Sequence, residues 1–237
     1  MATPPSFDQS DAPGGREFLP EPLPADPFPL FMAWFEEAAA RNLTPNPNAF
    51  TLATVDPDGQ PAARIVLCKS IDPRTGGIEF FTNYLSRKGR ALRAAPRAAA
   101  CLHWDALDRQ VRLEGQVTQV PAERSDEYFA SRPWESKIGA WASEQSTPIG
   151  SQGEMAARVM DAMKRFGLDP FDAPAHGEAI TIPRPPHWGG YFLHAQRAEL
   201  WVCGPGRVHD RAAWTRPLKV AGTVIEAGPW AVTRLQP

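Results

Sequence analysis

The chain has 237 residues, of which 43% are hydrophobic and 22% are charged, and its formal net charge at pH 7 is −2. This size and composition are typical of a soluble globular protein with one large domain or two small ones. The small net charge gives no general reason to expect nucleic acid or an anionic membrane as a partner, so any anion site must come from a local concentration of cations.

The cysteines and the N-terminus bear on the cell compartment. Cys68, Cys101 and Cys203 are odd in number, lie in apolar surroundings and lack the spacing of metal ligands, so we expect reduced thiols and no metal. The N-terminus lacks the basic and apolar regions of a secretory signal, and no apolar run approaches the length of a membrane span. We therefore expect a cytoplasmic protein with no membrane segment.

The first elements are an arm and a helix. Residues 1–25 are rich in Pro, Gly, Asp and Ser, which predicts a flexible, extended arm ahead of a single domain over residues 26–237. Asp26 and Pro27 open a helix. Its apolar residues recur at helical spacing: Phe28, Phe31, Trp34 and Phe35.

Closely spaced strands follow. Residues 49–55 and 60–72 flank a turn at residues 56–59 and form a predicted hairpin. Further strands are predicted at residues 78–82, 97–104 and 110–120, with a short helix over residues 86–95. Many strands with short connections and few helices indicate a mainly β protein with flanking helices, built on an antiparallel barrel or sandwich.

The C-terminal half adds helices and then strands. Helices are predicted at residues 122–131, from Trp134 onward and at residues 150–166, and the Pro-, Asp- and Gly-rich residues 167–186 are predicted to be a surface loop. Strands are predicted at residues 187–194, 198–203 and 207–215, with residues 230–235 closing the sheet.

One candidate anion site lies in residues 64–88. Arg64 and Lys69 end an apolar strand, and Ser86 is a predicted N-cap that places Arg87 and Lys88 in the first helical turn. A helix dipole favours acidic residues there, so two cations beside free backbone N–H groups suit a bound phosphate. From the charges alone, a solvated basic helix end explains the pattern equally well.

Two further groups are candidates. Tyr128 and Arg132 share a helical face, and with Ser136 and Lys69 they suit a phosphate monoester, although a surface Tyr–Arg pair is the commoner arrangement. Separately, alternate positions of the predicted strand 207–215 place three groups on one side: Arg207, His209 and Arg211. These side chains repel one another unless an anion or a ring lies over them.

A colinear set of short motifs links these groups. The motifs are RIVLCK at 64–69, FFTN at 80–83, SRK at 86–88, RQV at 109–111, SRP at 131–133, IGAW at 138–141, QS at 145–146, WGG at 188–190, RVHDR at 207–211 and RLQP at 234–237. Over residues 26–237 the chain resembles the pyridoxamine 5′-phosphate oxidase family. The resemblance implies an antiparallel FMN-binding split barrel and a homodimer with FMN at the subunit interface.

The resemblance also implies an activity and site residues. The activity is oxidation of pyridoxamine or pyridoxine 5′-phosphate to pyridoxal 5′-phosphate, with O₂ reduced to H₂O₂ and FMN supplying the redox chemistry. The implied FMN contacts are Arg64, Ile65, Val66, Leu67, Cys68, Lys69, Phe81, Thr82, Arg87, Lys88, Gln110, Gln145, Ser146, Trp201 and Arg211. The implied substrate contacts are Lys69, Tyr128, Arg132, Ser136, Arg207, Val208 and His209, and Arg207 and His209 are the implied catalytic residues.

One departure and two alternatives stand beside this interpretation. The family's N-terminal R-x-x-Y, which folds over the substrate, aligns here with residues 15–18, where Gly15 and Phe18 stand in place of the family's arginine and tyrosine. A split-barrel flavin oxidase acting on a phenazine-pathway intermediate is one alternative, and the second phosphate site argues against it. A non-catalytic module that binds nucleic acid through residues 87–97 is the other, but that stretch lacks interleaved aromatic residues.

Overall fold

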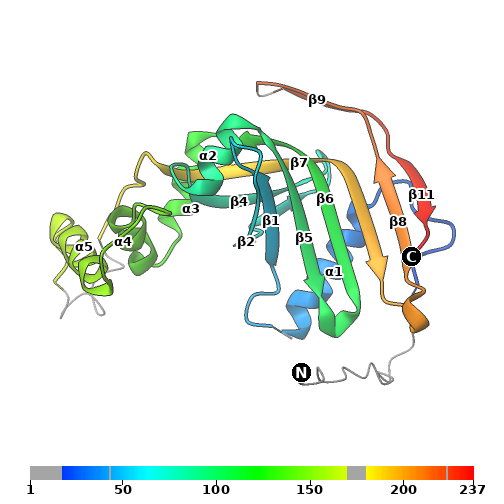
Figure 1. The fold of residues 1–237 in the computed structure, drawn as a ribbon, viewed down its shortest axis with the longest axis horizontal. Coiled ribbons are helices and arrows are strands. Elements are labelled where there is room, and N and C mark those ends of the chain that lie inside the picture. The colour runs from blue at the N-terminus through cyan, green and yellow to red at the C-terminus, as the bar shows by residue number, and fades with distance from the viewer. Residues whose placement is uncertain (1–17, 43, 170–179, 223) are drawn as a thin grey trace.

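An antiparallel sheet curled into a half barrel dominates the computed structural model, which describes residues 18–42, 44–169, 180–222 and 224–237 (Figure 1). Its strands are β1 (Ala49–Val55), β2 (Pro61–Leu67), β3 (Ser70–Asp72), β4 (Gly77–Asn83), β5 (Arg97–Trp104), β6 (Arg109–Gln119), β7 (Trp188–Val202), β8 (Asp210–Thr215) and β11 (Ala231–Leu235). The strand order is β11-β8-β7-β6-β5-β1-β2, with β4 pairing to β7 and β3 to β4. Flanking helices complete the predicted fold class, which is confirmed.

Strand β7 is longer than the sequence predicted. The two strands expected at residues 187–194 and 198–203 are one continuous strand, whose first half pairs with β4 and whose second half pairs with β8. Strand β6 pairs with both halves of β7, and the register of this pairing shifts between Glu114 and Gly115. A Cβ at Gly115 would collide with the backbone carbonyl of His194, so this position requires glycine.

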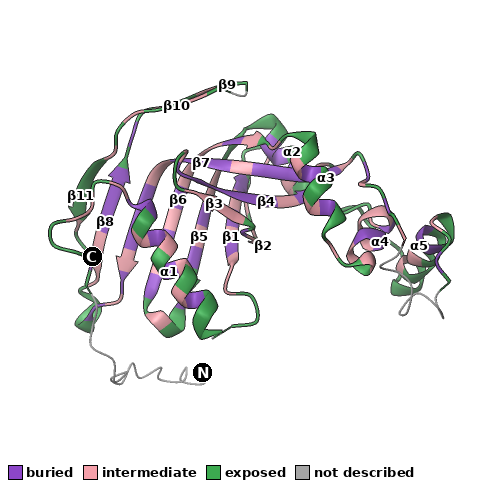
Figure 2. Ribbon diagram, turned by 180° about the vertical axis from the view of Figure 1, so that it is seen from behind, coloured by how far each residue is buried: buried purple, intermediate pink, exposed green. Residues whose placement is uncertain are grey.

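Helix α1 (Phe28–Arg41) covers one face of the sheet (Figure 2). The Asp26 carboxylate accepts a hydrogen bond from the Phe28 N–H at 2.8 Å, which satisfies one free donor of the first turn. Phe28 and Phe31 are fully buried against the sheet, and each such ring contributes roughly 1.5–3 kcal/mol of burial free energy. Tertiary packing of this predicted apolar face therefore holds the helix in place.

The other helices gather at one end of the sheet. They are α2 (Arg87–Ala94), α3 (Ala122–Ala130), α4 (Trp134–Ala142) and α5 (Gln152–Arg165), and α4 and α5 lie beyond the strands in Figure 1. A second apolar core joins α3, α4 and α5 to the start of β7, where Phe129, Ile138 and Trp188 are buried together. This second core positions α3 and α4 beside β2 and β4.

The described ends of the predicted arm and loop are packed against the protein. Residues 1–17 of the arm lie outside the described residues, but Leu19 is buried and its N–H donates to Asp210 at 2.8 Å. Residues 170–179 of the predicted surface loop are also outside the described residues, whereas Leu168 and Ile182 at its two ends are buried in the second core. These flanks are therefore held by apolar contacts.

Two short strands were not predicted. Strands β9 (Leu218–Ala221) and β10 (Val224–Ala227) form a separate two-stranded ribbon that projects from the end of β8 (Figure 1). The last strand, β11, returns from this ribbon and pairs with β8 at the edge of the sheet, as predicted for residues 230–235.

Candidate active site

A cavity of about 740 Å³ lies between the edge strand β2, strand β4 and helices α3 and α4. It brings together most of the predicted residues of the first two groups: Arg64, Ile65, Val66, Leu67, Lys69, Phe81, Thr82, Lys88, Tyr128, Arg132, Ser136 and Gln145. Among the described strands, β2 pairs with β1 alone, so the backbone groups of its other edge face the cavity without a paired strand.

The first anion site centres on Lys88. Its Nζ donates to Thr82 Oγ1 at 3.0 Å and to Gln145 Oε1 at 2.7 Å. Burial, reinforced by the nearby charge of Arg64, lowers the pKa of Lys88 from 10.5 to about 8. Lys88 and Arg64 lie close enough to repel each other, and no carboxylate is among the described residues that line this cavity, so an anionic ligand would offset the repulsion between the two cations.

Four residues predicted around this site do not line the cavity. Arg87 forms an ion pair with Asp56 at 2.6 Å outside it. Cys68 points into the core, where burial raises its thiol pKa to about 12. Ser146 lies beyond Gln145 in a left-handed turn with φ of 72°. The hydroxyl of Ser86 is used as the N-cap of α2, accepting from the Gly89 N–H at 3.3 Å, so the cap is confirmed but offers no free hydroxyl.

An aromatic stack forms the apolar wall of the cavity. The rings of Phe81 and Tyr128 are stacked with centroids 4.1 Å apart, and Phe81 is stacked on Trp188 at 5.4 Å. The Lys69 ammonium lies 5.5 Å from the centre of the Tyr128 ring. Trp188 entered the sequence analysis only as part of a motif, because periodicity does not show that β7 would deliver its first residue to α3.

The second anion site is built around Arg132. Its guanidinium lies 4.7 Å from the centre of the Trp188 ring, and its Nη1 is buried without a hydrogen-bond partner among the described residues. Helix α4 begins two residues later with no side-chain cap, and Ser136 is in its first turn. A buried unpaired donor is costly, so the guanidinium, the free helix N–H groups and the Ser136 hydroxyl together favour a bound anion.

The remaining predicted FMN contacts lie elsewhere on the sheet. Gln110, Trp201 and Arg211 form one row across β6, β7 and β8, and none of them lines the cavity. Trp188, which does line it, and Trp201 lie near opposite ends of β7, roughly 40 Å apart along an extended strand. We call the residues that line the cavity the first set and the row of Gln110, Trp201 and Arg211 the second set. One chain does not bring these two sets together.

Arg207 and His209 do not share a strand face with Arg211, and that prediction is wrong. Strand β8 begins only at Asp210, and Arg207 ends a short 3₁₀ turn, Pro205–Arg207, with a φ of 64°. The preceding Gly-Pro-Gly sequence extends the turn further than expected. His209 packs on Trp201 with ring centroids 4.6 Å apart, so it still lies in the second set, while Val208 is 66% exposed.

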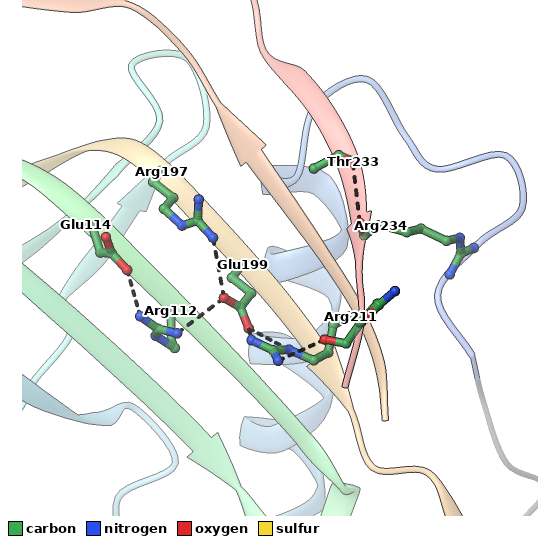
Figure 3. A network of polar contacts seen from close by, with 8 residues as sticks. Arg112, Glu114, Arg197, Glu199, Arg211, Thr233 and Arg234 are labelled. Carbon is green, nitrogen blue, oxygen red and sulfur yellow. Dashed lines mark hydrogen bonds and ion pairs between the residues drawn. The ribbon is translucent and has the colours of Figure 1, made fainter. Parts of the chain in front are cut away.

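A buried carboxylate that the sequence analysis missed holds this second set (Figure 3). Glu199 is 2% exposed and accepts from Arg211 Nε at 3.1 Å and Nη2 at 2.8 Å, and from Arg112 Nη1 at 3.2 Å. The sequence predicted a strand over residues 198–203 and so placed residue 199 in it. Only the pairing of β6, β7 and β8 shows that arginines surround this residue. The bidentate contact fixes the direction of the Arg211 guanidinium.

Another hollow, of about 860 Å³, lies along β1, β5, β6 and the root of the ribbon, and none of the predicted site residues lines it. No helix in the described part of the chain is long and apolar enough to cross a membrane.

The comparisons place this architecture in a known class. A solved structure of the Nostoc punctiforme protein titled a pyridoxamine 5′-phosphate oxidase-related, FMN binding protein superposes with a TM-score of 0.64 at 16% identity, covering 91% of this chain and all of that one. The PhzG structure from Burkholderia lata, solved with tetrahydrophenazine-1-carboxylic acid, superposes with a TM-score of 0.73 at 27% identity, covering 90% and 94%. The fold is that of the FMN-binding split barrels.

Sequence relatives narrow the class. Residues 36–163 match the family model described as pyridoxamine 5′-phosphate oxidase, and residues 188–237 match the pyridoxine 5′-phosphate oxidase C-terminal dimerisation region. Proteins named pyridoxine/pyridoxamine 5′-phosphate oxidase from Burkholderia multivorans and Bordetella petrii are 50% and 48% identical, covering 90% and 92% of this chain and 89% and 93% of theirs. The chain belongs to the pyridoxamine 5′-phosphate oxidase family, whose members are oxidoreductases.

Family membership implies FMN as the cofactor, and the residues of the cavity fit it. Lys88 and Arg64 are cations that would suit its phosphate, and the edge of β2 that faces the cavity has backbone donors and acceptors that would suit a polar ring. The half-buried ammonium of Lys88 lies in the same cavity wall as Arg64, and this pair of cations favours an anion at this position.

Proposed function

We propose that the protein is an FMN-dependent oxidase that converts pyridoxamine 5′-phosphate or pyridoxine 5′-phosphate to pyridoxal 5′-phosphate, with O₂ as the electron acceptor and H₂O₂ as the second product. The observation that carries the proposal is the buried, unpaired Nη1 of Arg132 beside the first turn of α4. This second anion site, in the same cavity as Lys88, suits a substrate that carries its own phosphate.

The residues of the cavity bind and orient the reactants. FMN would supply the redox chemistry needed at the substrate carbon that bears the amine or alcohol. Lys88 and Arg64 hold the cofactor phosphate, while Arg132, Ser136 and Lys69 hold the substrate phosphate. The stacked rings of Phe81 and Tyr128 form an apolar wall that excludes water from one side. Two fixed phosphates place the reacting atoms with little remaining freedom, and such positioning lowers the barrier.

The tautomer of His209 bears on its role. Its Nδ1 lies 3.2 Å from the Gly204 N–H and accepts a hydrogen bond from it, so the neutral ring carries its proton on Nε2. In this state Nε2 is a donor, suited to orienting a substrate oxygen. We assign to His209, together with Arg207, a positioning role in substrate binding, with the guanidinium of Arg207 supplying positive charge near the substrate ring.

The second set of residues requires a second subunit. Gln110, Trp201 and Arg211 are remote from the cavity in one chain, yet family resemblance assigns them to the same cofactor. The match of residues 188–237 to a dimerisation region supports a homodimer. We infer that each FMN site combines the cavity of one protomer with the β7–β8 row of its partner.

The deciding experiment is anaerobic titration of the purified yellow protein. Pyridoxamine 5′-phosphate is expected to bleach the flavin absorbance band, and readmission of O₂ should restore it with release of pyridoxal 5′-phosphate and H₂O₂. Unphosphorylated pyridoxamine is the matched control and should bleach the band far more slowly. A flavin that is bound but not reduced by the phosphorylated substrate would contradict the proposal.

A second candidate function has one observation in its favour. The structural relative PhzG carries a tetrahydrophenazine carboxylic acid, and this chain superposes on it over most of its length. Oxidation of such a tricyclic acid would not need Arg132 as a phosphate ligand. Flavin bleaching by a reduced phenazine carboxylate, with none by pyridoxamine 5′-phosphate, would select this candidate.

A further inference from the structure

The ribbon formed by β9 and β10 has no partner strand in the part of the chain that the structure describes. The two strands pair only with each other and project away from the main sheet in both ribbon views (Figures 1 and 2). A two-stranded hairpin alone is marginally stable in water. A ribbon that keeps this shape needs a surface to pack on.

The two faces of the ribbon differ in character. One face is wholly apolar, and its cross-strand pairs are Leu218 with Ala227 and Val220 with Ile225. The opposite face carries the Lys219–Glu226 pair, whose charged atoms are 3.7 Å apart, and the apolar pair Ala221 and Val224, of which Val224 is 56% exposed. One apolar and one charged face are typical of a sheet covered on a single side.

The root of the ribbon is held firmly. The Gly228 N–H donates to the Pro217 carbonyl at 3.0 Å, which closes the base of the hairpin. Arg216, just before it, is 8% exposed, donates to the carbonyls of Ala195 and Thr75 at 2.8 and 2.6 Å, and lies 4.2 Å from the centre of the Trp230 ring. These contacts fix the direction in which the ribbon leaves the body.

The position of the ribbon indicates what covers it. It lies within residues 188–237, which match a dimerisation region, and Pro217 and Pro229 at its root also line the 860 Å³ hollow beside the main sheet. We propose that the apolar face of the β9–β10 ribbon packs on a second copy of this chain, as an arm that extends the dimer contact. In a two-fold dimer each copy makes this contact, so the contact contributes twice to the free energy of dimer formation.

The test compares matched variants of the full-length holoprotein. Val220→Thr/Ile225→Thr makes the apolar face polar while keeping β-branched residues that favour a strand. Ala221→Ser/Val224→Thr makes similar changes on the opposite face and is the control. Subunit exchange between differently tagged copies is followed by native mass spectrometry, and amide hydrogen exchange is measured on the ribbon peptides.

We expect subunit exchange to become at least about tenfold faster in Val220→Thr/Ile225→Thr and to change by less than about threefold in the control. The ribbon amides should be protected in the wild-type dimer and lose protection in the first variant. If the variant does not fold, rapid exchange of the ribbon amides in the wild-type dimer would by itself overturn the proposal. Protected amides with an unchanged subunit exchange rate would also overturn it, because the covering surface would then not be the second copy.

Discussion

Lys88 shows how one half-buried charge links burial, pH and ligand binding. Its pKa of about 8 means that the apoprotein holds the ammonium in surroundings that partly disfavour it. The lowered pKa makes the charged state a cost to the folded apoprotein below pH 8, and this cost disappears as the pH rises from 8 towards the unfolded value of 10.5. A phosphate beside Nζ reverses the balance, because it stabilises the charged form.

This reversal predicts the pH dependence of FMN affinity. Above pH 8 the apoprotein must take up a proton on Lys88 when FMN binds, so the association constant should fall as pH rises, approaching tenfold per pH unit. Between pH 7 and 8 it should change little. Fluorescence titration of apoprotein with FMN from pH 7 to 9.5 measures the slope. Lys88→Met should bind FMN more weakly at pH 7 and lose the slope, and a slope that persists in this variant would rule out Lys88 as its origin.

Arg132 provides the second prediction at the residue scale. Arg132→Ala removes a charge-assisted contact of about 1.5–3 kcal/mol, so the KM for pyridoxamine 5′-phosphate should rise roughly ten- to hundredfold while FMN stays bound. Residual activity on unphosphorylated pyridoxamine should change little. Arg132→Lys keeps the charge but loses the planar donor geometry, so its KM for pyridoxamine 5′-phosphate should lie between those of the wild type and Arg132→Ala. Equal losses on both substrates would show that Arg132 does not contact the substrate phosphate.

At the scale of elements, the turn before β8 decides where the catalytic candidates lie. The sequence predicted a strand through Arg207, and the structure instead places this residue in a 3₁₀ turn with a left-handed backbone. A non-glycine residue there is strained by roughly 1–2 kcal/mol, and such strain is kept where the side chain is needed.

Comparing Arg207→Gly with Arg207→Met separates the backbone from the side chain. Glycine relieves the left-handed strain but adds freedom to the unfolded chain, so the free energy of unfolding should change by less than about 1 kcal/mol, as urea denaturation would show. Both variants should retain yellow FMN and slow anaerobic flavin reduction in stopped flow. Wild-type reduction rates in both would remove Arg207 from the substrate site.

At the scale of the whole molecule, the half barrel separates two sets of residues that we propose bind the same ligand. Strand β7 carries Trp188 beside the cavity near one end and Trp201 near the other. On the proposed function, each chain would therefore hold complementary halves of two sites. The two-fold symmetry of a homodimer would join each cavity to the other chain's row.

Subunit complementation tests this arrangement. Arg132→Ala alters the cavity half of a site, and His209→Ala alters the other half. If each site spans two subunits, a purified heterodimer of these variants has one doubly altered site and one intact site, so its activity should recover to about half that of the wild type. The control is a heterodimer of two differently tagged Arg132→Ala chains. It should keep the low activity of that variant when all proteins are assayed at a substrate concentration below the wild-type KM. Activity no higher than the mean of the two parent variants would place both residues in the site of one chain.

Most elements could be predicted from the sequence because their signals are local. Apolar spacing set α1, Ser86 marked the start of α2, and turn residues separated β1 from β2. The motifs from 64 to 88 indicated the cavity, since β2, β4 and α2 follow one another closely in the chain. Such features depend on contacts between residues that are near in sequence, which composition and periodicity report directly.

What the sequence alone did not reveal depends on contacts between distant strands. Glu199 is a hub only because β6 and β8 bring Arg112 and Arg211 to either side of β7, and Arg87 is withdrawn from the cavity because Asp56 lies beside it. The continuity of β7 likewise depends on pairing with β4 at one end and β8 at the other. Local sequence therefore determined which elements form and which residues carry charge, and strand pairing across the half barrel decided which charges meet.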